Sequence, residues 1–315
     1  MSMSSEDAVL IALGGNALIL PGEKGYIEEQ FVHTAACMRP IATLVSQGVP
    51  VVITHGNGPI VGNILLRNEC AKEYIPPMPL YICVADSQGG IGAMMAQSLR
   101  NELMRLAIER TVAAIVTHVV VDQSNPAFRN PTKPIGPYYS EEEARSYRDR
   151  MGWEMRNIPG RGWRRLVPSP RPRKIIELDA VRTCLERGAI PIAAGGGGIP
   201  VIEDGRIRGV DAVVDKDLSA SLLARGLGLK RFAILTDVDG VYLNWNSREQ
   251  ERMKRLTVAE AGRLLLEGQF PPGDMGPKIE AAVEFIESGG REVVVTKPEL
   301  LLEALKGEAG TVITA

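Results

Sequence analysis

The chain has few cysteines, histidines and aromatic residues, and it has no strong excess of charge of either sign. Its four cysteines, Cys37, Cys70, Cys83 and Cys184, form no CxxC pair, and its three histidines show no metal-ligand spacing. A disulfide framework and a zinc site are therefore excluded as the basis of the fold. We expect the cysteines to be reduced core residues of a cytosolic protein.

The 36 basic and 38 acidic residues leave a net charge of −2. This balance argues against a general nucleic-acid-binding or membrane-surface protein. No apolar run approaches the ~18 residues that a membrane span requires. Residues 1–7 carry no basic stretch before the apolar run 8–13, so we expect no signal peptide and a cytoplasmic location.

The chain does contain a regular alternation of short apolar strand patterns and helical patterns. Strands are predicted at residues 8–13, 50–54, 111–121, 190–194, 232–236, 292–296 and 311–314. Helices are predicted at 27–47, 60–73, 86–110, 140–151, 175–188, 219–227, 257–267, 273–288 and 298–305. Such alternation predicts an α/β fold with an open, mainly parallel central sheet and helices on both faces. We expect residues 1–315 to form a single domain.

Three predicted strands end in glycine-rich segments, at residues 14–16, 55–58 and 195–198. Parallel topology brings such ends to one edge of the sheet, where backbone N–H groups can reach a phosphate. A tight turn is the alternative for the first segment. The second segment lacks the glycine spacing and the distal acidic residue of a dinucleotide site, so we reject that function. His55 either contacts a substrate or is structural, and the sequence favours neither.

The stretch 191–217 combines these features. A short strand runs into Gly195–Gly198, a hairpin with Asp204 and Gly205 at its tip follows, and Lys216 then stands between two aspartates at the start of a helix. This arrangement predicts phosphoryl transfer with Lys216 as a participant. Whether the four glycines contact a phosphate or only allow a close approach of the chain stays open.

Residues 122–172 have a different composition, with many prolines and one clear helical pattern at 140–151. We expect this segment to be an inserted, lid-like lobe. Seven basic residues and no acidic one lie between Arg156 and Lys174. We interpret them as a solvated or salt-bridged face, in preference to steering of small anions or a nucleic-acid patch. Near the C-terminus, Lys278 follows Pro277 in a first helical turn, where a cation is unfavourable unless an anion lies beside it.

Eight segments in order resemble the carbamate kinases, a branch of the amino acid kinase family. The matching segments are residues 12–17, 55–59, 130–137, 160–164, 167–170, 195–200, 215–217 and 275–280. Segment 130–137 favours this branch over acetylglutamate, uridylate and aspartate kinases. Ala93 stands where the family more often has an aromatic residue.

The resemblance implies reversible phosphoryl transfer between ATP and carbamate, which gives ADP and carbamoyl phosphate. It also implies Mg²⁺, held mainly by the ATP phosphates with no metal site in the protein, and a homodimer. Two alternatives remain: another kinase of the family acting on a small carboxylate or phosphate, or a catalytically silent nucleotide-binding regulatory module.

The resemblance assigns roles to individual residues. Lys133, Lys216 and Lys278 are the expected catalytic cations, and Asp217 is expected to orient them. Residues expected to bind the acceptor and the transferred phosphoryl group are Gly14, Gly15, Asn16, Gly56, Asn57 and Gly58. Residues expected to flank the nucleotide are Asp237, Tyr242, Met275, Gly276, Pro277 and Lys278.

Overall fold

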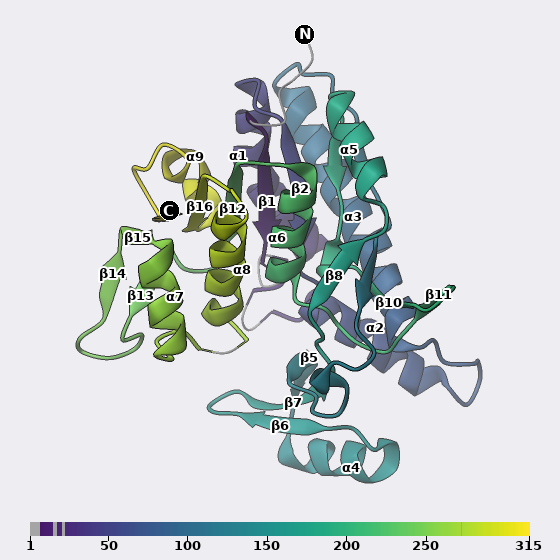
Figure 1. Cartoon of the computed structure of the whole chain (residues 1–315). Coiled ribbons are helices and arrows are strands. Elements are labelled where there is room, and N and C mark those ends of the chain that lie inside the picture. The colour runs from purple at the N-terminus through teal and green to yellow at the C-terminus, as the bar shows by residue number, and fades with distance from the viewer. Residues whose placement is uncertain (1–6, 15–17, 21–22, 272) are drawn as a thin grey trace.

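The structure is a computed structural model that describes residues 7–14, 18–20, 23–271 and 273–315. Its centre is an eight-stranded sheet with the strand order β15-β17-β16-β12-β1-β2-β9-β3 (Figure 1). The strands are β1 (Val9–Leu13), β2 (Val51–His55), β3 (Val112–Ala114), β9 (Ile190–Ile192), β12 (Arg231–Leu235), β15 (Arg255–Thr257), β16 (Glu292–Thr296) and β17 (Thr311–Thr314). All neighbouring pairs are parallel except β16 and β17. The predicted fold class is confirmed.

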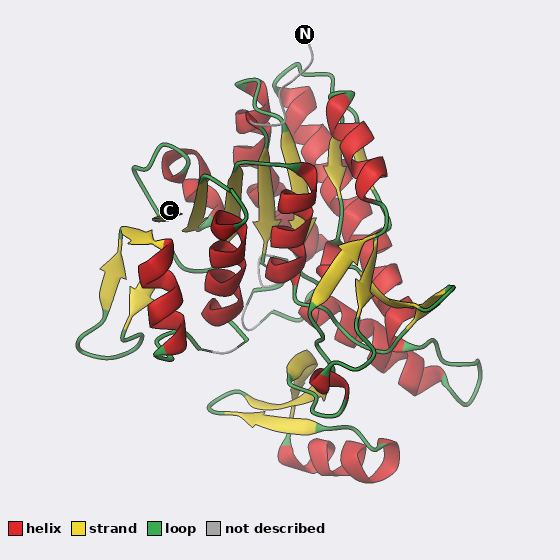
Figure 2. Ribbon diagram, viewed as in Figure 1, coloured by secondary structure: helices red, strands yellow, loops and turns green. Residues whose placement is uncertain are grey.

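Helices cover both faces of this sheet (Figure 2). The alternation of side chains along β1 shows why its residues form an unbroken apolar run: Leu10 and Ala12 belong to one buried cluster, and Val9, Ile11 and Leu13 to the other. The first cluster includes α5 (Leu178–Glu186), α6 (Lys216–Leu227), α7 (Val258–Leu266) and α8 (Met275–Glu287). The second includes α1 (Ile27–Ser46), α3 (Leu80–Arg105) and α9 (Leu301–Ala304).

A second sheet has the order β11-β10-β4-β8. Its strands are β4 (His118–Val121), β8 (Pro172–Ile175), β10 (Ile199–Glu203) and β11 (Ile207–Gly209). The predicted hairpin is confirmed, because β10 and β11 pair antiparallel on either side of Asp204 and Gly205. The prediction of one strand over 111–121 is wrong, because β3 and β4 belong to different sheets. Between them Gln88 pairs with the backbone N–H and C=O of Thr117, as a strand neighbour would.

The start of α3 also differs from the prediction. The helix begins at Leu80, after Pro79, and not near Asp86. The reason is tertiary packing: Leu80, Cys83 and Val84 join a buried cluster with α2 (Gly58–Ala71) and β10. Capping by Asp86 or Ser87 is therefore wrong, and both residues lie inside the helix.

The 122–172 segment contains the three-stranded sheet β5-β7-β6, which lies away from the central sheet in Figure 1. Its elements are β5 (Lys133–Tyr139), β6 (Met155–Ile158), β7 (Gly162–Val167), η3 (Pro126–Phe128) and α4 (Glu141–Met151). The predicted helix is confirmed, with Ser140 and Glu143 forming a capping box at its start. Tyr147 of this helix packs against Tyr139 and Trp153.

The remaining elements are β13 (Val241–Leu243), β14 (Glu251–Met253), η4 (Gly195–Gly197) and η5 (Pro298–Leu300). Thr257 and Glu260 form a capping box at the start of α7. No helix in the described ranges is long and apolar enough to cross a membrane.

The cysteines and the basic stretch 156–174 differ in how well they match the sequence-based expectations. Cys37 and Cys83 are buried, but Cys70 is exposed, so the core assignment of all four cysteines is wrong. Cys70 lies on an outer position of α2, where the helix needs no apolar contact. The salt-bridged interpretation of the basic stretch is confirmed at its end, in the ion pairs Arg171–Glu280, Arg173–Asp122 and Lys174–Glu203.

Candidate functional site

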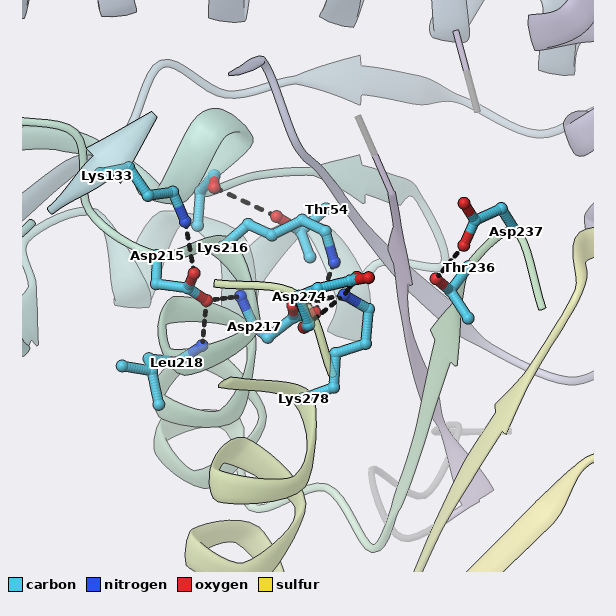
Figure 3. Close-up of polar contacts among 11 residues, drawn as sticks. Thr54, Lys133, Asp215, Lys216, Asp217, Leu218, Thr236, Asp237, Asp274 and Lys278 are labelled. Atoms are coloured by element: carbon cyan, nitrogen blue, oxygen red, sulfur yellow. Dashed lines mark hydrogen bonds and ion pairs between the residues drawn. The ribbon is translucent and has the colours of Figure 1, made fainter. Parts of the chain in front are cut away.

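A cavity of about 440 Å³ lies at the carboxyl ends of the central strands. Residues that directly follow β1 and β2 line it, namely Gly14, Gly56, Asn57 and Gly58. Lys133 of β5 and the starts of α6 and α8 complete its charged wall (Figure 3). Residues far apart in the sequence thus meet at the sheet edge that the strand topology predicted.

Asp215 is the N-cap of α6, and its two carboxylate oxygens have different partners (Figure 3). Oδ1 accepts hydrogen bonds from the backbone N–H groups of Asp217, at 2.9 Å, and Leu218, at 3.4 Å. Oδ2 accepts a hydrogen bond from the Lys133 ammonium at 2.5 Å. One side chain therefore starts the helix that carries Lys216 and also holds the lysine of β5.

Asp217 lies between the other two lysines. Its Oδ1 accepts a hydrogen bond from Lys216, and its Oδ2 is 3.7 Å from Nζ of Lys278. Lys278 also donates to the backbone carbonyl of Asp274 at 2.9 Å. The expected orienting position of Asp217 thus has a geometric basis, since one carboxylate contacts lysines from two helices.

Burial and charge act in opposite directions on these groups. Burial alone would lower the pKa of Lys278, but Asp217, Asp274 and Asp215 outweigh it, so that pKa lies above its ordinary value. Burial lowers the pKa of Lys216, and the nearby Lys278 adds to this shift against the attraction of Asp217. Burial would raise the pKa of Asp215, yet Lys133 and Lys216 hold it well below its usual range.

Two carboxylates of the protein compensate for the unfavourable position of Lys278 at a helix start. Asp217 and Asp274 supply the negative charge that the helix dipole argument requires. The charge conflict therefore does not by itself require a phosphate.

The four glycines at 195–198 are required by close approach of the chain to its neighbours. A Cβ atom at Gly195 would overlap the ring of His55, and one at Gly196 would overlap the side chain of Asn57. Gly196 also has a φ of +64°, which favours glycine, and it lines the cavity. The close-approach explanation, which the sequence left open, has clear steric support.

His55 lies beneath this glycine turn and is 1% exposed. Its Nδ1 is 3.0 Å from the carbonyl of Gly56, and its ring packs against Gly195. Burial lowers the pKa of His55 to about 4, an effect only partly opposed by the Gly56 contact, so the imidazole is neutral near pH 7. The geometry favours the structural alternative for this residue.

The structure places the predicted site residues in three groups. Those that line the cavity are Gly14, Gly56, Asn57, Gly58, Lys133, Lys216, Asp217, Asp237 and Lys278. Gly15 and Asn16 lie outside the described residues. The residues that do not line the cavity are Tyr242, Met275, Gly276 and Pro277. Of these, Tyr242 donates to Asp239 at 2.7 Å, and Met275 packs against the core.

Sequence reasoning missed several cavity residues: Asp215, Asp274, Thr236, Arg164, Lys297 and Glu299. Asp215 carried a usable signal, because an aspartate just before a helical pattern is a preferred N-cap. Arg164 is one of seven basic residues in the stretch 156–174, and the sequence pattern there does not distinguish a cavity residue from a surface residue.

Comparison with known proteins agrees with this geometry. Residues 7–297 match the family model described as the amino acid kinase family, and the chain belongs to that family. A carbamate kinase from Pyrococcus furiosus is 45% identical over 96% of this chain and 98% of its own length. A carbamate kinase from Giardia lamblia bound to citric acid is 40% identical, with a TM-score of 0.94 over 99% of both chains.

A second Giardia lamblia carbamate kinase structure, bound to AMP-PNP, is 39% identical, with a TM-score of 0.90 over 99% of both chains. These similarities extend over nearly the whole chain. The resemblance to carbamate kinases that the sequence motifs predicted is confirmed.

Proposed function

We propose that the chain is a carbamate kinase that catalyses reversible phosphoryl transfer between ATP and carbamate, giving ADP and carbamoyl phosphate. The observation that carries this proposal is the convergence of Lys133, Lys216 and Lys278 on one cavity walled by glycine turns. Three cations beside backbone N–H groups match a reaction in which anionic oxygens must be held close together. The carbamate kinases to which the chain is similar support the choice of acceptor.

Phosphoryl transfer requires alignment and charge neutralisation more than covalent work by the protein. Carbamate is already an anion, so it attacks once it is aligned and needs no general base. In this scheme Lys216 and Lys278 contact the transferred phosphoryl group and the nucleotide phosphates, and Lys133 contacts the carbamate or carbamoyl phosphate. Asp217 holds the two buried lysine side chains in position and favours their charged forms. Backbone N–H groups of Gly14 and of Gly56–Gly58 are proposed to bind the acceptor and the transferred phosphoryl group, together with Gly15 and Asn16, which lie outside the described residues.

The nucleotide is proposed to bind beside Asp237, Tyr242 and residues 275–277. The AMP-PNP complex of the Giardia lamblia relative supports an ATP-type substrate. Among the described residues no group of three or more histidine, cysteine or acidic side chains could hold a metal ion, and Asp215 and Asp217 are engaged by lysines. We propose that a Mg²⁺ ion is carried mainly by the nucleotide phosphates, whose charge it would neutralise.

We propose in addition that residues 1–315 work as one kinase domain with the 122–172 segment as a substrate lid. The support is the position of Lys133 on β5 of that segment, in contact with Asp215 of the main body. A variant with residues 134–166 replaced by a short linker is expected to lose affinity for carbamoyl phosphate more than for ADP. Equal losses in calorimetry would contradict the lid role. A cytoplasmic homodimer is the proposed working form.

A coupled assay for ATP formation from ADP and carbamoyl phosphate tests the central proposal. ATP formation that depends on both substrates is the expected result. Activity only with acetyl glutamate, UMP or another acceptor would instead support a different kinase of the family. Nucleotide binding without turnover of any acceptor would support a regulatory module.

A further inference from the structure

Two cations that line the cavity, Lys297 and Arg164, are not used by the three-lysine scheme. Arg164 lies in the middle of β7, and its guanidinium is stacked over the ring of Tyr138, with the central carbon 5.3 Å from the ring centroid. It lines the cavity together with Lys133, Pro134 and Ile135 of the neighbouring strand β5.

The three lysines of the scheme and Arg164 differ in whether a carboxylate balances their charge. Lys133 pairs with Asp215, and Lys216 and Lys278 share Asp217. Within the part of the chain that the structure describes, Arg164 forms no ion pair, and its Nε is buried without a hydrogen-bond acceptor. An anion that reaches Arg164 therefore meets a cation whose charge no carboxylate has neutralised.

A guanidinium N–H that is buried without an acceptor is costly, because it has lost water and gained no hydrogen bond in return, and the Nε of Arg164 is such a group. Burial accordingly lowers the pKa of Arg164, and the nearby Arg161 acts in the same direction. The register of β6 and β7 also places Arg156 directly opposite Arg164, a pairing of like charges. A ligand with anionic oxygens would accept the free hydrogen bond and offset the facing positive charges.

We infer that Arg164 is a further substrate-binding residue of this site, which binds the phosphoryl oxygens of the small acyl phosphate substrate. The inference rests on the proposed function, since it assigns Arg164 to carbamoyl phosphate in the same cavity. The planar guanidinium suits two oxygens of a phosphoryl group at once, a geometry that a lysine ammonium cannot provide.

The surroundings of Arg164 favour the acyl phosphate over the nucleotide. Arg161, three residues earlier at the tip of the β6–β7 hairpin, has a pKa that is raised first by Tyr138 and more weakly by Asp237 and Asp274 on the proposed nucleotide side. Arg164 lies farther along β7, beside the strand that carries Lys133. It therefore belongs to the wall that receives the small substrate.

Three variants of the full-length protein test this inference. Arg164→Gln removes the charge, and Arg164→Lys keeps the charge but loses the planar fork. Arg150→Gln is the matched control, because it removes an exposed arginine of α4, in the same segment, that does not line the cavity. The KM values for carbamoyl phosphate and ADP are measured in the ATP-forming direction. Calorimetric titration with carbamoyl phosphate alone measures binding without turnover.

For Arg164→Gln we expect the KM and the dissociation constant of carbamoyl phosphate to rise roughly 10- to 100-fold, the range for one hydrogen bond to a charged group. The KM for ADP should change less than 2-fold. Arg164→Lys should lie between this variant and the wild type, and Arg150→Gln should match the wild type. If Arg164→Gln fails to fold, Arg164→Lys carries the test, because it keeps the charge and most of the stem.

Unchanged carbamoyl phosphate affinity in a folded Arg164→Gln protein would overturn the inference, as would an equal rise in the KM for ADP. A purely structural role on Tyr138 would lower the melting temperature and leave both KM values unchanged. Failure of the proposed function is a separate result, because the wild-type protein itself would then form no ATP from carbamoyl phosphate.

Discussion

Replacement of Asp215 by asparagine isolates the ion pair that joins β5 to the start of α6. An asparagine keeps the oxygen that accepts from the N–H groups of Asp217 and Leu218, so the helix cap is retained. It loses the negative charge that faces Lys133. The expected loss of stability therefore reports the pair and not the cap.

The magnitude follows from the burial of the two side chains, of which 11% is exposed for Asp215 and 22% for Lys133. Removing one partner of a fully buried pair costs about 3–5 kcal/mol, while exposed pairs contribute about 0–1 kcal/mol. This partly buried pair lies between these limits, so Asp215→Asn should lower the free energy of unfolding by about 1–3 kcal/mol. Asp215→Ala should cost about 1 kcal/mol more, because it also removes the cap.

The assay is urea unfolding followed by tryptophan fluorescence and circular dichroism at neutral pH. A double-mutant cycle with Lys133→Met should give a coupling energy of about 1–2 kcal/mol. The matched control is Glu203→Gln, which breaks the exposed pair with Lys174 and should change stability by less than about 0.5 kcal/mol. A coupling energy for Asp215 and Lys133 no larger than the stability change of the control variant would refute the reasoning.

Three further predictions concern the cavity and its glycine turn. Lys216→Ala should lower kcat by on the order of 100-fold or more with an unchanged circular dichroism spectrum, and near wild-type turnover would remove Lys216 from the mechanism. Gly196→Ala should destabilise the protein by about 1–3 kcal/mol, because its Cβ would overlap Asn57 at a positive φ. Gly89→Ala, in open space on α3, should instead stabilise it by roughly 0.5–1 kcal/mol, and equal effects of the two would contradict the steric argument. Because the folded pKa of His55 is about 4 and the unfolded value is about 6.5, the unfolded state binds more protons between these values, so stability should fall as pH decreases through this window. His55→Gln should make that fall shallower in denaturation curves from pH 7 to 4, and an unchanged slope would count against a buried neutral imidazole.

The alternation of strands and helices predicted the layers of the fold, because a strand buried on both faces must be apolar along its whole length. β1 and β2 are such strands, and their glycine-rich ends do meet at one sheet edge. The capping boxes at α4 and α7 are likewise local features, since each joins residues three positions apart. Where the prediction failed, contacts between residues far apart in the sequence decided the outcome. The side chain of Gln88 bonds to the backbone of the chain between β3 and β4, and packing against α2 and β10 extends α3 back to Leu80.

The sequence by itself determined the fold class, the family and the three lysines, because these depend on local periodicity and on short motifs in a set order. Only the tertiary structure decided how the charges of the site are paired. The pairing of Lys133 with Asp215 joins residues 82 positions apart, and Asp217 is shared between two helices. Tertiary structure likewise separates Arg164, which lines the cavity without an ion pair in the described structure, from the other arginines of the same basic stretch, which do not line it. Pairing and burial depend on distances between elements, which no local pattern along the chain specifies.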